Sequence, residues 1–188
     1  CIRDSTNNNG LFRLAHQVTV VADYPVGEWQ VLVDAQTGEV FRAADAAHYA
    51  TGTGNVFDPD PLATAGVAYG GNYVDNNDAN NTALTNELVN VTLLDITLSG
   101  GTYTLIGPYA QIVDSEAPNN GLYGQSSSTF NYNREDDAFE AVNTYYHVDA
   151  SMRYINETLG INLAPFQYSG GAKFDPHGLN GSDNSHYT

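Results

Sequence analysis

The sequence predicts an α+β protein: antiparallel β-structure over most of the chain, with one long amphipathic helix near the C-terminus. Two observations predict this class. Segments with alternating apolar and polar residues, separated by turn residues, recur before residue 129. A segment with apolar residues three and four positions apart then follows. A hydrophobic content of 41% in 188 residues is enough for a buried core.

The first strands flank a turn between Asp34 and Gly38. Trp29, Val31 and Val33 alternate with other residues before it, as expected for a strand with one buried face. The Asp34 carboxylate can accept hydrogen bonds from turn amides, and Gly38 can adopt a positive φ. We therefore predict a β-hairpin here, with Trp29 on its buried face.

Further strands are expected within residues 89–113. Apolar residues alternate on both sides of the Ser-Gly-Gly turn at 99–101, and the Gly-Pro pair at 107–108 should bend the second strand. The stretches at 69–88 and 115–128 are rich in Gly, Asn and Ser, and we predict that both are loops.

The last third predicts a helix over about residues 135–159, or two helices with a break near Asp149. The acidic run at 135–137 would lie in the first turn, where the helix dipole favours negative charge. Gly160 is placed to end the helix in the left-handed conformation.

The charge balance is strongly acidic, with 22 acidic against 6 basic residues and a net charge of −16. Such a surface repels phosphate backbones and anionic membranes, so we expect neither nucleic acid nor membrane as a partner. It is typical of a secreted or salt-exposed protein, or of one that binds cations. The single cysteine, Cys1, excludes an internal disulfide and a cysteine-based zinc cluster.

The C-terminal run is the richest in groups that could carry chemistry. His177 and His186, with Asp175 or Asp183, could form a zinc site in a loop, but no two histidines have the spacing of a helical zinc motif. His147 on the expected helix is better explained as a surface or lightly packed residue than as a metal ligand. The sequence has no nucleophile elbow, phosphate loop or dinucleotide fingerprint, so the residues alone reveal no complete active site.

A second candidate site is the Asn/Asp run at residues 75–81. Asp75, Asn77 and Asp78 offer the hard oxygen ligands that calcium prefers. The run is not an EF-hand, because Asn80 stands where that loop requires glycine. A solvated loop explains it equally simply. This run suggests an alternative function, an extracellular β-rich calcium-binding or adhesion module.

Several stretches, in this order, resemble a known family. Residues 14–43 carry the signature W-x-V-x-V-D-A-x-T-G-x-V and resemble the closing half of the PepSY-type propeptide module of secreted metalloproteases. Residues 52–61 resemble the segment that follows this module in fungalysin-like and thermolysin-like precursors. Residues 130–160 resemble the long helix that opens their catalytic domain, and residues 175–188 resemble the approach to its active-site helix.

The resemblance implies three regions. Residues 1–50 would be the C-terminal half of the propeptide module, 51–128 a β-rich connector, and 129–188 the start of the catalytic domain. A propeptide of this kind inhibits the enzyme and guides its folding. Because only half of the module is present, its sheet would keep an open edge, which predicts self-association through edge strands.

The resemblance also implies that the zinc helix, with its H-E-x-x-H motif, lies beyond the "DNSHYT" equivalent and is not in this chain. The parent protein would be a secreted zinc metalloendopeptidase whose zinc ligands lie elsewhere, and this chain would not be catalytic by itself. Its partners would be the remainder of the parent protease and that enzyme's peptide substrates. Asn180 is the nearest match to a family asparagine that hydrogen-bonds the substrate backbone, although the N-A-x-W pattern expected there is absent.

Overall fold

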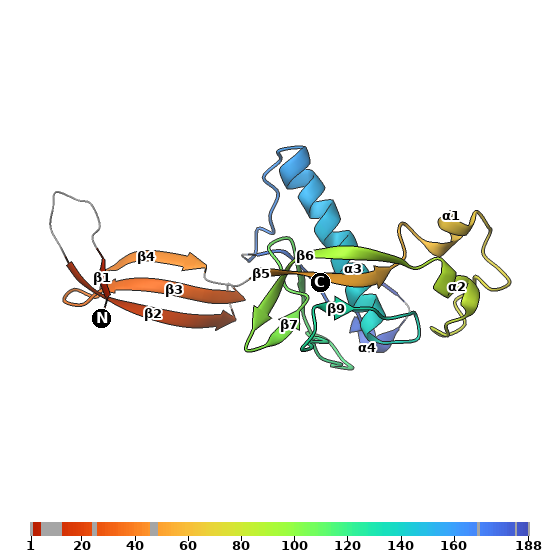
Figure 1. The fold of residues 1–188 in the computed structure, drawn as a ribbon, viewed down its shortest axis with the longest axis horizontal. Helices are drawn as coiled ribbons and strands as arrows, with labels where there is room; N and C mark the ends of the chain where they lie inside the picture. The colour runs from red at the N-terminus through yellow and green to blue at the C-terminus, as the bar shows by residue number, and fades with distance from the viewer. Residues whose placement is uncertain are drawn as a thin grey trace. The chain divides into compact units, whose positions relative to one another are not determined.

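A computed structural model describes residues 2–4, 13–23, 26–45, 49–168, 170–182 and 184–187 (Figure 1). The chain divides into two compact units, which we describe separately. Unit 1 holds Cys1–His48 with Phe166–Ser169, and unit 2 holds Tyr49–Pro165 with Gly170–Thr188. The described residues form mainly antiparallel sheets and one long helix near the C-terminus, so the predicted α+β class is confirmed.

Unit 1 contains an antiparallel sheet with the strand order β1-β2-β3-β4. Its strands are β1 (Ile2–Asp4), β2 (Arg13–Asp23), β3 (Val26–Asp34) and β4 (Val40–Asp45). The turn between β3 and β4 forms as predicted. The Asp34 carboxylate accepts hydrogen bonds from the amides of Gln36 at 2.8 Å and Thr37 at 3.0 Å, and Gly38 has a φ of +75°. The predicted hairpin is confirmed.

Trp29 is half-buried and lies on the face of β3 opposite buried Leu32 and Asp34, because successive side chains of a strand alternate. The prediction that Trp29 lies on the buried face was therefore wrong. Its face also carries Val18 and Val20 of β2, which are 44% and 42% exposed. Strands β1 and β4 form the two edges of the sheet, and self-association through them stays a prediction.

Unit 2 is built on a second sheet, with the strand order β7-β6-β5-β9. Its strands are β5 (Tyr49–Val56), β6 (Val89–Ser99), β7 (Thr102–Thr104) and β9 (Thr129–Phe130). The predicted turn joins β6 to β7, and Gly100 and Gly101 both have positive φ there. The chain then breaks at the Gly-Pro pair 107–108 and resumes as β8 (Ala110–Ile112).

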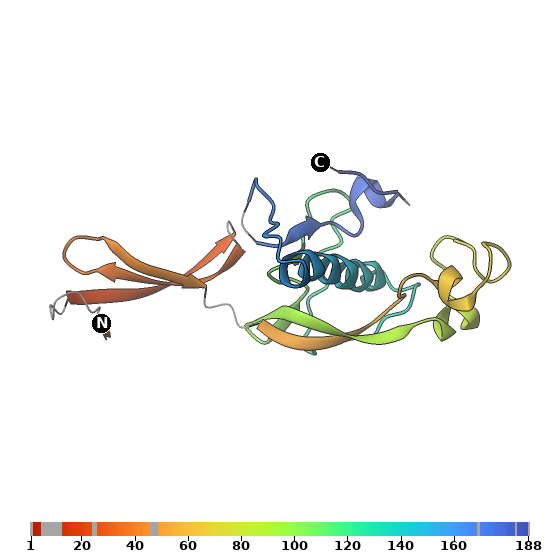
Figure 2. The same ribbon diagram turned by 90° about the horizontal axis from the view of Figure 1, so that it is seen from above.

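The long helix α3 (Ala138–Arg153) crosses the β5–β6 ribbon and continues as the π-helical turn η1 (Tyr154–Thr158) (Figure 2). It forms a single run without a break at Asp149. It begins three residues later than predicted, so the acidic run at 135–137 precedes the helix rather than forming its first turn. Gly160 has a φ of +67° just beyond the end, as predicted.

Two glycines of β5 allow close packing, Gly54 against helix α3 and Gly52 against neighbouring segments of the sheet. A Cβ atom on Gly54 would lie 2.6 Å from Cγ1 of Val142 in α3. A Cβ atom on Gly52 would lie 2.6 Å from Cδ1 of Ile96 and from the Ser128 carbonyl oxygen. Gly54 therefore permits close packing between the helix and the sheet, and Gly52 permits it among the segments of the sheet.

The main core of unit 2 lies between α3 and the sheet. Its largest fully buried side chains are Tyr145, Phe130, Leu93, Ile96, Leu105, Ile112, Val56 and Val142. The Tyr145 hydroxyl donates a 2.8 Å hydrogen bond to the Leu94 carbonyl, so this ring is buried without leaving its polar group unpaired.

The segment between β5 and β6 contains two short helices, α1 (Pro61–Ala65) and α2 (Thr82–Asn86). The second falls inside residues 69–88, and the prediction of a loop throughout that stretch was wrong. The Asn81 carboxamide caps α2 by accepting a 3.0 Å hydrogen bond from the Leu84 amide. Leu84 packs in a small cluster with Phe57 and Phe139, and this burial fixes the helix.

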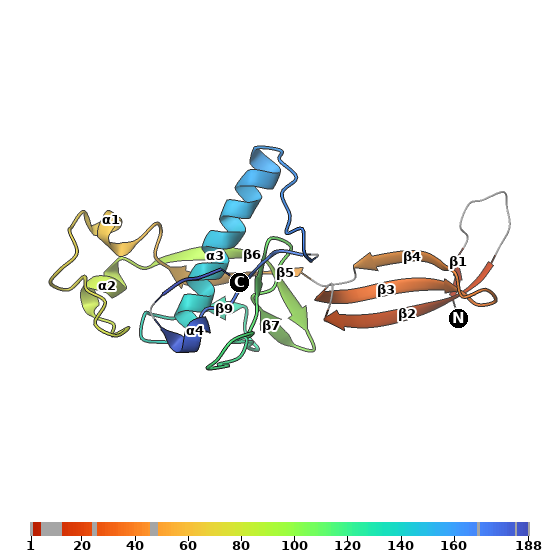
Figure 3. The ribbon, with the colours of Figure 1, turned by 180° about the vertical axis from the view of Figure 1, so that it is seen from behind.

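After η1 the chain returns to the body of unit 2, as the view from behind shows (Figure 3). Strand β10 (Ala172–Phe174) pairs in parallel with β8. The short helix α4 (Gly178–Gly181) follows, and Leu179 and Asn180 in it have left-handed backbone angles. This end of the chain therefore lies beside the loop that follows β8.

Candidate functional site

Two carboxylates bind the C-terminal segment and the loop after β8 to each other. Asp175 Oδ2 accepts hydrogen bonds from the amides of Ser115 at 2.9 Å and Glu116 at 3.0 Å. In return, Glu116 Oε2 accepts one from the Leu179 amide at 2.8 Å, and His186 Nε2 lies 3.0 Å from Glu116 Oε1. The Leu179 amide, followed by His186, holds the pKa of Glu116 below its ordinary value of 4.5.

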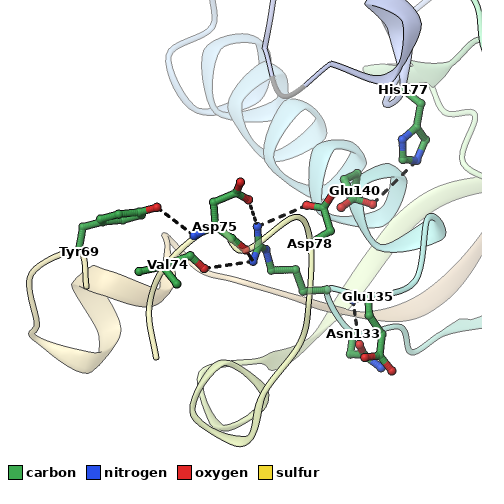
Figure 4. Close-up of polar contacts among 9 residues, drawn as sticks. Tyr69, Val74, Asp75, Asp78, Asn133, Glu135, Glu140 and His177 are labelled. Carbon is green, nitrogen blue, oxygen red and sulfur yellow. Dashed lines mark hydrogen bonds and ion pairs between the residues drawn. The ribbon is translucent and has the colours of Figure 1, made fainter. Parts of the chain in front are cut away.

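His177 joins the same segment to the start of α3. Its Nε2 donates a 2.7 Å hydrogen bond to the Asp137 carbonyl. The same nitrogen lies 3.9 Å from Glu140 Oε2 (Figure 4). The centre of the Tyr123 ring is 5.7 Å from that of the imidazole. Because a carbonyl can only accept, the proton of His177 resides on Nε2 in either charge state.

Glu140 has a partly buried carboxyl group that is incompletely paired. Its Oε2 is buried and has no hydrogen-bond partner among the described residues. Burial raises the pKa of the Glu140 carboxyl, and His177 opposes that rise only in part. A carboxyl group with a raised pKa is a candidate for proton exchange. The described residues around Glu140 do not indicate where a substrate would bind.

The candidate calcium ligands converge on an arginine. Asp75 and Asp78 both form ion pairs with Arg134, Asp78 at 3.3 Å (Figure 4). The guanidinium also donates hydrogen bonds to the carbonyls of Val74 and Asp75. Asn77 lies in the same loop, where residues 76–78 all have left-handed φ values. Arg134 thus supplies a positive charge to both carboxylates, and calcium binding by this loop stays a prediction.

Arg134 is the residue that sequence reasoning missed. It stands directly before the acidic run at 135–137 and has a side chain only 16% exposed. The available signal was the rarity of cations in the chain. A basic residue among so many acids tends to be paired, but its partners lie 56 and 59 positions away in the sequence.

Of the residues proposed for a loop zinc site, the two histidines have different partners. His177 contacts the start of α3, whereas His186 contacts Glu116, and Asp183 lies outside the described residues. Across the described parts of the chain, no group of three or more His, Cys, Asp or Glu side chains is arranged to hold a metal ion. His147, predicted to be a surface or lightly packed residue, is partly buried, with its Nε2 2.8 Å from the Phe57 carbonyl oxygen.

Asn180, the candidate substrate-binding residue, is exposed at the tip of α4. Its amide donates a 2.8 Å hydrogen bond to the Ala117 carbonyl, and its φ is +58°. The backbone of Asn180 is therefore fixed, while the side chain stands at the surface. Whether it contacts a substrate stays a prediction.

Comparisons with known proteins identify no relative. No family model matches the chain, and neither a curated protein nor a solved structure matches it. In the described residues, no helix has the length and apolar character needed to cross a membrane.

Proposed function

We propose that this chain is a non-catalytic scaffold segment of a secreted zinc metallopeptidase precursor. In this proposal residues 1–50 are the end of the propeptide, residues 51–128 the connector and residues 129–188 the start of the catalytic domain. The proposal rests on the ordered motifs of residues 14–43, 52–61, 130–160 and 175–188.

The observation that best supports the proposal is the layered arrangement of unit 2. Helix α3, which carries the most diagnostic of the motifs, packs on the β5–β6 ribbon through Gly54 and Val142. The segment after β10, which carries the last motif, is then held beside the start of that helix by His177 and against the loop after β8 by Asp175. A separate sheet precedes both, in the order that a propeptide and a catalytic domain require.

The described residues do not fit a catalytic zinc ion. A zinc site of a hydrolase needs three protein ligands around an open position. No such group of side chains exists within the described parts of this chain. The zinc ligands and the catalytic base would come from the remainder of the parent protease, and this chain would position them.

The decisive experiment is to sequence the encoding gene beyond the codon for Thr188. The proposal expects an open frame that encodes H-E-x-x-H within roughly the next hundred codons. A frame that closes without that motif would overturn it. As a second measurement, the purified chain is incubated with zinc and an unfolded protein substrate; peptide-bond hydrolysis would also contradict the proposal, because the expected rate is that of buffer alone.

The alternative, a calcium-binding or adhesion module, has one observation in its favour: the carboxylates of Asp75 and Asp78 lie close enough together to share one cation, here the guanidinium of Arg134. Calcium would have to compete with Arg134 for them. Calorimetry at millimolar Ca²⁺ tests this, with Asp78→Asn as the variant and Asp60→Asn as the control. The alternative requires heat in the wild type and the control that is lost in the variant. Absence of heat in all three removes it.

A further inference from the structure

The C-terminal segment, defined here as the described residues within 175–187, is attached to unit 2 by polar contacts. None of its described side chains is fully buried. Strand β10, immediately before it, is anchored by pairing with β8 and by the 2.9 Å hydrogen bond from the Val113 amide to the Phe174 carbonyl. The segment therefore has a fixed hinge at Phe174, and a few hydrogen bonds hold the residues beyond this hinge.

Glu116 is the central acceptor of these hydrogen bonds. One of its oxygens receives the Leu179 amide at 2.8 Å, and the other lies 3.0 Å from His186 Nε2. Gly178 permits this approach, since a Cβ atom there would lie 3.3 Å from Glu116 Oε2. A carboxylate that accepts from two donors holds them more strongly than a neutral carboxyl group does.

The backbone at the contact is held in an unfavourable conformation. Leu179 has φ and ψ of 55° and 39°, and Asn180 has 58° and 33°. A leucine in the left-handed region is uncommon and persists only where its surroundings hold it there. The contacts that hold it are the Glu116 carboxylate and the hydrogen bond from the Asn180 amide to the Ala117 carbonyl. Loss of the carboxylate contact therefore also favours relaxation of the turn.

We propose that the C-terminal segment is an acid-released strap, in which protonation of Glu116 frees Leu179 and His186 and lets the segment leave the loop after β8. The charged groups that face Glu116 are His186 and Asp175, both from the strap. His177 is faced by the Glu140 carboxyl group from α3 and by the backbone carbonyl of Asp137, the residue just before α3. Asp175, His177 and Glu116 therefore each hold the strap, and the Glu116 contacts lie nearest the chain end.

The sign of the pH effect follows from Glu116. Its pKa is held below 4.5 in the docked state, mainly by the Leu179 amide and then by His186. A lowered carboxyl pKa means that docking is fully favoured above pH 4.5 and is lost as the pH falls through the lowered value. The strap is therefore closed at neutral pH and opens in acid, while β10 stays paired. This inference does not depend on the proposed function.

Amide hydrogen exchange at neutral pH tests the strap, with Glu116→Gln as the variant and the exposed Glu135→Gln as the matched control. We expect the Leu179 and Asn180 amides to exchange about tenfold faster in E116Q, with β10 and α3 unchanged. Equal rates in E116Q and wild type would overturn the strap.

A pH titration of the wild type, followed by amide resonances, gives a test that needs no variant. The resonances of residues 177–182 should change together below pH 4.5, before helical circular dichroism is lost. A single transition shared with α3, or no change before global unfolding, would overturn the proposal. Asp175→Asn provides a second variant, expected to speed exchange at the Ser115 and Glu116 amides, which donate to the Asp175 carboxylate.

Discussion

The two units use their sheets differently. In unit 2 a helix covers the β5–β6 ribbon, and eight large side chains are fully buried between them. In unit 1 the buried hydrophobic residues, among the side chains described there, are Ala15 and Leu32. Val18 and Val20 of its sheet are more than 40% exposed. A β-sheet needs a covering layer to bury its apolar face, and the described residues supply that layer only in unit 2.

This difference between the sheets indicates which unit contributes most of the free energy of folding. Burial of apolar surface is the dominant favourable contribution, so unit 2 should carry most of the stability of the chain. Two probes separate the units in one experiment. The single tryptophan, Trp29, lies in unit 1, whereas all helices of the described residues lie in unit 2. Tryptophan fluorescence and helical circular dichroism therefore report on different units.

Leucine truncation should give the largest contrast. Leu93 in β6 is 1% exposed, whereas Leu14 in β2 is 50% exposed. We expect Leu93→Ala to lower the free energy of unfolding of unit 2 by about 2–5 kcal/mol, because it leaves a cavity in a packed core. Leu14→Ala should change unit 1 by less than about 0.5 kcal/mol. Denaturant titrations with both probes measure this. A loss above about 1 kcal/mol for Leu14→Ala would show that a covering layer exists.

Glycine substitution should give the next largest effect, and for a different reason in each unit. Gly54→Ala should destabilise unit 2 by about 1–3 kcal/mol through overpacking against Val142. Gly38→Ala in unit 1 meets no atom within 4 Å, and should cost about 1 kcal/mol because its φ is +75°. Adding Val142→Ala should partly rescue the first variant and leave the second unchanged. If Val142→Ala has the same effect on both glycine variants, overpacking and the positive φ are not distinct causes of their destabilisation.

Local patterns in the sequence predicted the local structures well. The turn at Asp34 and Gly38 and the helix that ends before Gly160 each depend on residues close in sequence, so single-sequence rules identified them. The burial of Trp29 and the helix α2 were predicted wrongly, because both depend on distant packing. Which face of β3 is buried, and whether Leu84 finds Phe57 and Phe139, cannot be read from neighbouring residues.

The candidate site shows the same limit more strongly. Candidate ligands such as Asp75, Asp78 and His177 could be chosen by residue type and loop position. Their partners could not, because Arg134 and Glu140 reach them from far along the chain. Electrostatic pairing between distant loops leaves no periodic signal in a sequence, whereas alternation and helical spacing do.

The smallest predicted effect is a pH dependence of opposite sign at two carboxyl groups, Asp34 in unit 1 and Glu140 in unit 2. Hydrogen bonds from the Gln36 and Thr37 amides lower the pKa of Asp34, so its contribution is present above pH 3.8 and is lost as the pH falls. Burial raises the pKa of Glu140, so its contribution is present below pH 4.5 and is lost as the pH rises through the raised value.

Two variants that replace these carboxyl groups with neutral amides test the two directions of pH dependence. Asp34→Asn should destabilise unit 1 at pH 7 and approach the wild type in acid, as followed by Trp29 fluorescence. Glu140→Gln should stabilise unit 2 at pH 7 by less than about 1 kcal/mol, because the wild-type protein must keep a charged carboxylate partly buried at that pH. Near pH 4 the wild-type carboxyl group is neutral, so this advantage of the variant should be lost. Glu135→Gln should do neither. If Glu140→Gln is instead destabilising at pH 7, the Glu140 carboxylate has a partner that outweighs its burial, and the contrast between the units fails at this point.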